Sequence, residues 1–226
     1  MSLLLAIDTA TEACSAALWQ DGAILSRYQV APRGHTELIL PMVQELLAEA
    51  GVTLAQLDGL AFGRGPGSFT GVRITLGVAQ GLAFGADLPL VGVSNLQALA
   101  QGAHRHGGCE RVLAAIDARM DEIYVGGFAL EQGVMIETLP EQVLAPKDFL
   151  AAGDERWQQG AGSGFVTYPD LTGRVDVLCE AVPFPEARDM LPAALQDLAA
   201  GKGVSAAEAR PVYLRDKVTW QKLPGR

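Results

Sequence analysis

The sequence predicts an α/β protein built from two similar lobes, each with a mixed sheet flanked by helices. A unit of strand, acidic residue, turn and two further strands occurs twice, opening with LLLAID at 3–8 and with VLAAID at 112–117. Asp8 and Asp117 occupy the same place in the two units, 109 residues apart (117 − 8). This indicates a duplicated lobe, with chance similarity as the alternative for such short segments. The 226 residues, 49% of them hydrophobic, suffice to bury the cores of two lobes of about 100 residues each.

The elements follow from short apolar runs bounded by turn residues and from apolar residues repeated at helical spacing. Strands are predicted at 3–8, 14–19 and 23–30, from 57 into a loop ending at 67, and at 89–93, 112–117, 123–130 and 134–138. Helices are predicted at 35–51, 69–84, 94–104, 146–152 and 186–200. Three strands are followed by a helix, a strand and a helix, and this order occurs twice. It is the layout of the actin-like (ASKHA, ribonuclease-H-like) fold. We expect residues 1–105 to form the first lobe and 106–226 the second, with a C-terminal helix able to pack back on the first lobe.

The helix at 35–51 carries a wide apolar stripe, because Leu38, Met42 and Leu46 repeat at i,i+4. Pro41 lies inside this pattern, so we expect either a helix start close to Leu38 or a bend.

The helix at 69–84 follows the glycine-rich loop, and Ser68 can cap it. Gly77, Gly81 and Gly85 fall on one face, although an interior glycine costs a helix about 1 kcal/mol relative to alanine. Such a face implies close approach of another backbone, either the chain's own sheet or another helix.

Charge and cysteine content exclude several protein classes. The net charge of −9 argues against a free-standing nucleic-acid binder, although residues 210–226 carry five basic side chains against Asp216 and so +4. This basic tail is either a solvated terminus or a contact for RNA or an acidic partner. Three widely spaced cysteines indicate neither a disulfide framework nor a zinc knuckle. No stretch approaches the roughly 18 apolar residues of a membrane span, so we expect a cytoplasmic protein.

The loop GRGPGSFTGVR at 63–73 resembles a phosphate cradle but fails the specific tests. It lacks the GxxxxGK[ST] and GxGxxG spacings, which leaves either a structural turn or an anion held at a helix start. The weak candidates for nucleotide binding are Asp8, Thr9, Gly65, Gly67 and Ser68. Asp8 could place a metal or a water molecule, with Asp117 as its only obvious companion, or it could orient the hairpin turn.

Histidine is too scarce to suggest a catalytic or metal centre. His104 and His106 lie together in a predicted polar loop without a third ligand, and His35 precedes its helix as a capping or contact residue. The spacing supports no Ser-His-Asp or Cys-His arrangement. These histidines therefore indicate no metal site by themselves, and the alternative roles of Asp8 stay open.

Motifs spread over nearly the whole chain resemble the TsaB (YeaZ) family. They are AIDTAT (6–11), HTELILPMVQELL (35–47), GPGSFTGVR (65–73), GVSNLQALA (92–100), DARMDEIY (117–124) and YLR (213–215). The resemblance implies a non-catalytic subunit of the bacterial machinery that attaches threonylcarbamoyl to N6 of the tRNA adenosine next to the anticodon.

The implied partners are the catalytic paralogue TsaD, the small ATPase TsaE and, when the paralogue is missing, a second copy of the chain. A separate synthase delivers threonylcarbamoyl-AMP, and tRNA is reached through the complex. The resemblance implies no tightly bound cofactor in this chain alone. ATP or ADP and a metal are expected only in the complex.

Compared with the catalytic paralogue, the segment SNLQALA (94–100) lacks the two metal-binding histidines, whose positions fall on Asn95 and Leu99. The family pairs through the two helices of the first lobe, and whether the apolar stripe faces inward or toward the partner stays open. The predicted interface residues are His35, Leu38, Met42, Leu46, Arg73, Gly77 and Gly81.

Two other functions remain as alternatives. An actin-fold ATPase or small-molecule kinase would use Asp8, the 65–68 loop and Asp117. A metallopeptidase would need a bound zinc or iron.

Overall fold

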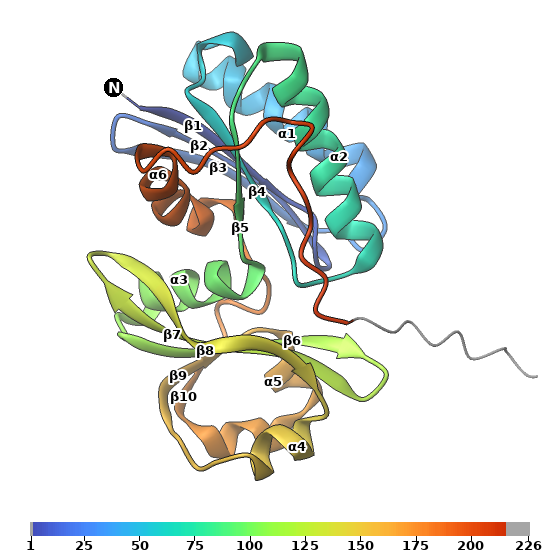
Figure 1. Ribbon diagram of the computed structural model, residues 1–226, viewed down its shortest axis with the longest axis vertical. Coiled ribbons are helices and arrows are strands. Elements are labelled where there is room, and N and C mark those ends of the chain that lie inside the picture. The colour runs from blue at the N-terminus through green and yellow to red at the C-terminus, as the bar shows by residue number, and fades with distance from the viewer. Residues whose placement is uncertain (1, 216–226) are drawn as a thin grey trace, which may run out of the picture.

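The computed structural model describes residues 2–215 and shows two α/β lobes stacked along the long axis of the molecule (Figure 1). The strands are β1 (Leu3–Asp8), β2 (Ala13–Gln20), β3 (Ala23–Val30), β4 (Gly59–Gly63), β5 (Leu90–Val93), β6 (Arg111–Arg119), β7 (Glu122–Glu131), β8 (Val134–Leu144), β9 (Trp157–Ala161) and β10 (Val175–Cys179). The α-helices are α1 (His35–Ala50), α2 (Phe69–Ala86), α3 (Asn95–Gly107), α4 (Pro146–Ala151), α5 (Ser163–Thr167) and α6 (Leu191–Ala199). Short 3₁₀ helices are η1 (Leu54–Gln56), η2 (Pro169–Arg174) and η3 (Ala187–Met190).

The two sheets repeat one topology. Each has five strands, in the orders β3-β2-β1-β4-β5 and β8-β7-β6-β9-β10. The first three strands of each lobe pair antiparallel, and the last two continue the sheet in parallel. The predicted duplication is confirmed, and the fold is the actin-like one.

Alternation along β1 divides the first lobe into two cores, since successive side chains of a strand point to opposite faces. Leu5 and Ile7 pack beneath α1 and α2, whereas Leu4 and Ala6 pack against η3 and α6. The first sheet is therefore covered by helices on both faces.

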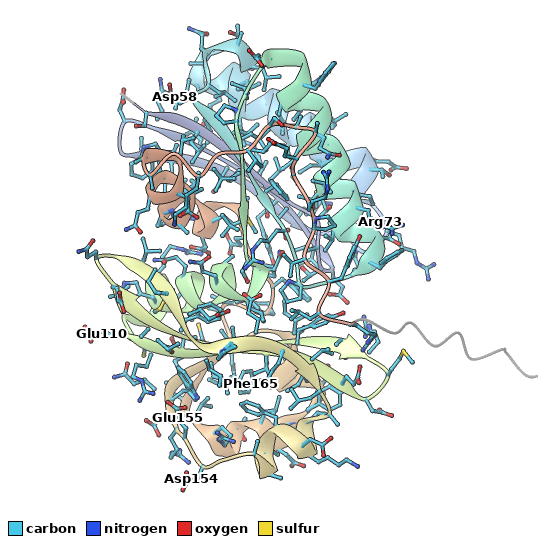
Figure 2. All side chains as sticks on the ribbon, in the orientation of Figure 1. Asp58, Arg73, Glu110, Asp154, Glu155 and Phe165 are labelled. Atoms are coloured by element: carbon cyan, nitrogen blue, oxygen red, sulfur yellow. The ribbon has the colours of Figure 1, made fainter. Side chains whose placement is uncertain are left out.

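The second lobe is layered in the same way. Leu96 and Leu99 of α3 pack on one face of the sheet, and α4, α5 and η2 cover the other. Figure 2 shows Phe165 inside this lobe, where it is 2% exposed, and Asp154 and Glu155 at its outer edge.

The packing divides the chain differently from the predicted boundary at 105/106. The helix α3 belongs to the second lobe by its contacts, whereas η3 and α6 return to the first lobe. The helix α6 packs on the first sheet, as expected for a C-terminal helix that returns to the first lobe. A boundary drawn from the repeat misses this exchange, because each helix packs where its apolar residues find a complementary sheet face.

Most predicted bounds agree with the structure within three residues, but β8 continues to Leu144, six residues beyond the predicted end at 138, and α6 begins at Leu191, five residues after the predicted start at 186. The helix α1 begins at His35 and contains Pro41, so of the two predicted alternatives the start near Leu38 is excluded. His104 and His106 lie in the last turn of α3 and not in a loop. The strands β9 and β10 were missed, since their sequences lack a clear alternation of apolar and polar residues.

After α6 the chain runs back along the first lobe as a strap, defined here as residues 200–215, which is seen beside α2 in Figure 1. Val204 pairs with Leu90 at the edge of the sheet, and the amide of Val212 donates to the carbonyl of Arg64. Most of the predicted basic tail, residues 216–226, lies outside the described residues. Within the described part, no helix has the length and apolar content needed to cross a membrane.

Candidate functional site

Asp8 ends β1 as a fully buried carboxyl group. The side-chain amide of Asn95 donates to its Oδ1 at 2.8 Å, whereas its Oδ2 has no hydrogen-bond partner among the described residues. Burial raises the pKa of Asp8 from 3.8 to about 7, an effect that the Asn95 hydrogen bond partly offsets. With 0% exposure, Asp8 offers no accessible oxygen to a substrate or a metal ion.

The Asp8→Asn variant is expected to become more stable relative to the wild-type chain as pH rises from 5 to 8. A raised pKa means that the folded state keeps a proton that the unfolded state has already lost, so Asp8 destabilises the fold increasingly up to about pH 7. Between pH 5 and about 7 this effect amounts to about 3 kcal/mol, at about 1.4 kcal/mol per pH unit. Thermal unfolding of both proteins across this range tests the prediction, and a difference in melting temperature that does not change with pH would contradict it.

The loop between β4 and α2 uses most of its polar groups internally. The amide of Gly65 donates to Asn95 Oδ1 at 2.9 Å, and the amide of Ser68 donates to the carbonyl of Ala10 at 2.7 Å. A Cβ on Gly67 would lie 2.4 Å from that same carbonyl oxygen. Thr9 is equally occupied, since its hydroxyl donates to the carbonyl of Gly71 at 2.8 Å. These contacts favour a structural turn over a phosphate cradle.

Ser68 caps α2 as predicted, with its Oγ accepting from the amide of Gly71 at 3.4 Å. The predicted nucleotide candidates therefore hold together the ends of β1, β4 and α2. Ser68 and Gly67 also reach the cleft described next.

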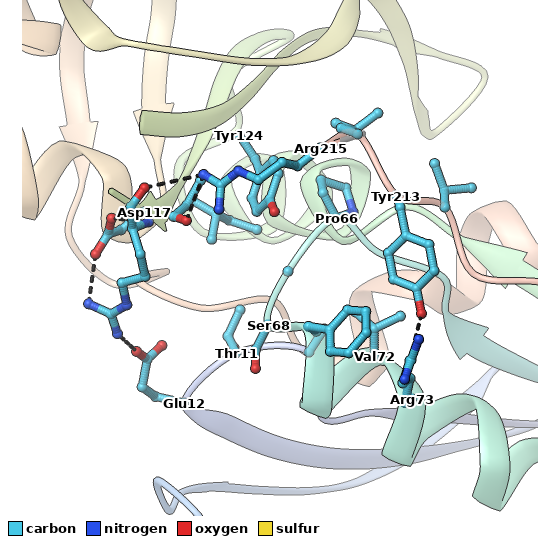
Figure 3. Close-up of a pocket in the computed structure, with 18 of the residues that line it drawn as sticks. Thr11, Glu12, Pro66, Ser68, Val72, Arg73, Asp117, Tyr124, Tyr213 and Arg215 are labelled. Atoms are coloured by element: carbon cyan, nitrogen blue, oxygen red, sulfur yellow. Dashed lines mark hydrogen bonds and ion pairs between the residues drawn. The ribbon is translucent and has the colours of Figure 1, made fainter. Parts of the chain in front are cut away.

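A cleft of about 1000 Å³ lies between the lobes. One wall comes from the first lobe, including the N-terminal ends of α1 and α2, and the other comes from the β6–β7 hairpin, which carries Asp117 and Tyr124. The strap closes one side with Val212, Tyr213 and Arg215 (Figure 3). Asp8 does not line this cleft, so the structure does not bring Asp8 and Asp117 together there.

Ion pairs join the walls at the mouth of the cleft. Arg119 contacts Asp117 of its own hairpin at 2.8 Å and Glu12 of the first lobe at 2.7 Å. Arg215 of the strap donates through Nε to Glu122 at 3.0 Å. The dashed contacts in Figure 3 include Arg73 of α2, whose Nε donates to the Tyr213 hydroxyl at 3.1 Å.

The outer face of α2 is open. A Cβ built on Gly77, Gly81 or Gly85 would meet nothing within 4 Å, so the chain's own sheet does not explain these glycines. Phe84 beside them is 85% exposed. Leu40 on α1 is 44% exposed. We call the exposed residues of α1 and α2 the outer face.

The predicted interface residues fall into two groups. Met42 and Leu46, exposed by 7% and 0%, belong to the chain's own core, and His35 is 8% exposed. The inclusion of Met42 and Leu46 in a contact surface is corrected, because a partner could not reach them without opening the lobe, whereas His35 lines the interlobe cleft. Leu38 is half-buried against the same core.

Arg73, Gly77 and Gly81 are exposed on α2. Sequence reasoning missed Leu40, Phe69 and Phe84. Phe84 could have been found by spacing, since it lies three residues after Gly81 on the glycine face.

Asn95 and Leu99, the positions of the metal-binding histidines in the catalytic paralogue, are both fully buried. Asn95 bridges Asp8 and Gly65, and Leu99 is fully buried and packs against Gly162. Among residues 2–215, no group of three or more histidine, cysteine, aspartate and glutamate side chains is placed to hold a metal ion.

Comparisons with known proteins agree over the whole chain. A family model described as TsaD: tRNA N6-adenosine threonylcarbamoyltransferase matches residues 28–200. The tRNA threonylcarbamoyladenosine biosynthesis protein TsaB of Escherichia coli (strain K12) is 50% identical over 99% of both chains. The protein of the same name from Haemophilus influenzae is 45% identical over 99% of this chain and 98% of its own.

Solved structures give the same result. YeaZ from Pseudomonas aeruginosa superposes with a TM-score of 0.85 at 49% identity, covering 95% of this chain and 100% of that one. A crystal structure described as a protein with similarity to peptidase YEAZ from Pseudomonas aeruginosa superposes with a TM-score of 0.87 at 51% identity, with the same coverage.

Proposed function

The chain belongs to the TsaB (YeaZ) family, and we propose that it acts in tRNA threonylcarbamoyladenosine biosynthesis as a non-catalytic scaffold that binds and activates the catalytic TsaD subunit. The observation that carries this proposal is the outer face of α1 and α2. Its glycines have open space above them, and Phe84 is 85% exposed. An apolar, close-approach helix face of this kind suits packing against helices of another protein.

The interior of the fold supports a non-catalytic role. The position where a reactive carboxylate would be expected, Asp8, is sealed from solvent and hydrogen-bonded to Asn95. Leu99 has no atom able to ligate a metal, and it fills the core of the second lobe instead. A reactive group has to reach its substrate, and these side chains do not.

The remaining partners belong to the same proposal. TsaE and tRNA would join through the complex, and a second copy of the chain would occupy the outer face when TsaD is missing. ATP or ADP and a metal would be held by the complex and not by this chain alone. The setting would be the cytoplasm, where tRNA is modified.

The test mixes the purified chain, a TsaD homologue, threonylcarbamoyl-AMP, TsaE with ATP, and unmodified tRNA. We expect no modified adenosine with the chain and tRNA alone, and product by mass spectrometry when all components are present. We also expect the chain and the TsaD homologue to co-elute in size-exclusion chromatography. Modification by the chain without TsaD would overturn the non-catalytic role, and separate elution would overturn the scaffold role.

An actin-fold ATPase or small-molecule kinase is the second candidate, favoured by the cleft of about 1000 Å³. Calorimetric titration of the lone chain with Mg-ATP separates the two. Tight binding with turnover would favour this candidate over the scaffold. A metallopeptidase would instead reveal stoichiometric zinc or iron in metal analysis.

A further inference from the structure

The first-lobe wall of the cleft carries positive charge that residues 2–215 do not neutralise. Arg33 precedes α1 and forms no ion pair within residues 2–215. Among the described residues, Arg73 donates only to the neutral Tyr213 hydroxyl, and it lies over the Phe69 ring, 3.7 Å from its centroid. Both guanidinium groups line the cleft. They therefore stand as uncompensated cations in a chain whose net charge is −9.

The other charges of the cleft are already paired. Arg119 is held by Asp117 and Glu12, and Arg215 is held by Glu122. The helices α1 and α2, of 16 and 18 residues, both begin at the first-lobe wall and add the positive ends of their dipoles. The first turn of α1 contains the acidic Glu37, whereas that of α2 contains no acidic residue. The surplus of positive charge is thus confined to the wall that carries Arg33 and Arg73.

This charged wall is continuous with the outer face. Arg73 and Phe69 lie in the first turns of α2, and Phe69 is 52% exposed. A partner that covers the outer face to its end would cover Arg73 as well. Burying a guanidinium without a counter-charge is unfavourable, so a partner that binds there has to supply an anionic group.

We propose that the partner subunit presents carboxylate side chains to Arg33 and Arg73, which both line the interlobe cleft. The inference rests on the scaffold function proposed above and names the chemistry that the partner has to provide. The Phe69 ring and the Tyr213 hydroxyl orient Arg73, and the ring centroids of Phe69 and Tyr213 are 5.6 Å apart. Only the Nε of Arg73 is used within the described chain, so its terminal N–H groups remain available for a two-point contact with a carboxylate.

The experiment measures binding of a TsaD homologue to the full chain and to charge-reversal variants. Arg33→Glu is the cleaner variant, because no partner of its side chain within the chain is lost. Arg73→Glu and the double variant extend the test, and Arg73→Gln removes the charge while retaining a polar side chain. Lys147→Glu is the matched control, since Lys147 is an exposed cation on α4 in the second lobe and the charge change is the same. Thermal unfolding shows whether each variant keeps the fold.

We expect each reversal to weaken binding roughly tenfold or more, and Lys147→Glu to bind like the wild-type chain. The wild-type affinity should fall as NaCl is raised, and the double variant should lose most of that salt dependence. An Asp or Glu of the partner changed to Arg should restore binding to the double variant. Folded variants that bind like Lys147→Glu would overturn the inference, as would loss of tRNA binding with partner binding unchanged. Absence of binding by the wild-type chain would instead overturn the scaffold function.

Discussion

Gly81→Arg is expected to abolish binding of the TsaD homologue while leaving the isolated chain folded. Gly81 lies at the middle of the α2 outer face, and a side chain there projects into open space in the single chain. The free energy of unfolding should rise by up to about 1 kcal/mol, because arginine favours a helix more than glycine does. A partner helix packed closely against the glycine face would collide with the new side chain, which gives a loss of affinity of roughly 100-fold or more.

Gly173→Arg is the matched control for this variant. Gly173 also has no neighbour within 4 Å of its Cβ position, but it lies in η2 of the second lobe. Size-exclusion chromatography and calorimetric titration with the TsaD homologue distinguish the two variants. If Gly81→Arg formed the complex as well as Gly173→Arg, the outer face of α2 would not be the docking surface.

Leu46→Ala is expected to lower the free energy of unfolding by about 2–5 kcal/mol, the usual cost of a cavity left by a fully buried leucine. Leu46 lies on the inward side of α1 and is 0% exposed. Leu40→Ala, six residues earlier on the same helix, should change stability little because Leu40 is 44% exposed. The affinity for the TsaD homologue should show the reverse order. Leu40→Ala should weaken the complex, and Leu46→Ala, where it is folded, should bind like the wild-type chain.

Urea unfolding gives the stability of the two variants, and titration with the TsaD homologue at a temperature where both are folded gives their affinity. The contrast separates the inward side of α1 from its outward side. Equal stabilities would place Leu46 outside the core, and an unchanged affinity for Leu40→Ala would remove α1 from the docking surface.

The sequence alone could not assign the apolar positions of α1 and α2 to the core or to a contact surface. The stripe of Leu38, Met42 and Leu46 and the glycine face of α2 were each visible from their spacing. Apolar side chains suit a core and an interface equally well, so spacing alone does not say which side meets the sheet. The structure answers this because α1 packs on β2 and β3, so that Met42 and Leu46 lie in the core of the first lobe.

The glycine-rich loop at 63–73 also shows a difference between what its sequence suggests and what its contacts do. Its composition suggested phosphate binding, whereas its fold uses Gly65 and Gly67 to bring the loop against the strap and the end of β1. The contacts join residues far apart in sequence, such as Gly65 with Val212, so no local pattern predicts them.

The sequence alone determined the duplicated architecture, most strand and helix positions, the capping of α2 and the family. These features depend on local periodicity, on turn residues and on motifs that are contiguous in the chain. Tertiary structure alone decided that α3 packs on the second lobe, that Asp8 is sealed against Asn95, and that Arg33 and Arg73 line the same cleft. Each of these depends on which distant surfaces pack together, and that choice is made by the complementarity of whole sheet faces and not by any single segment.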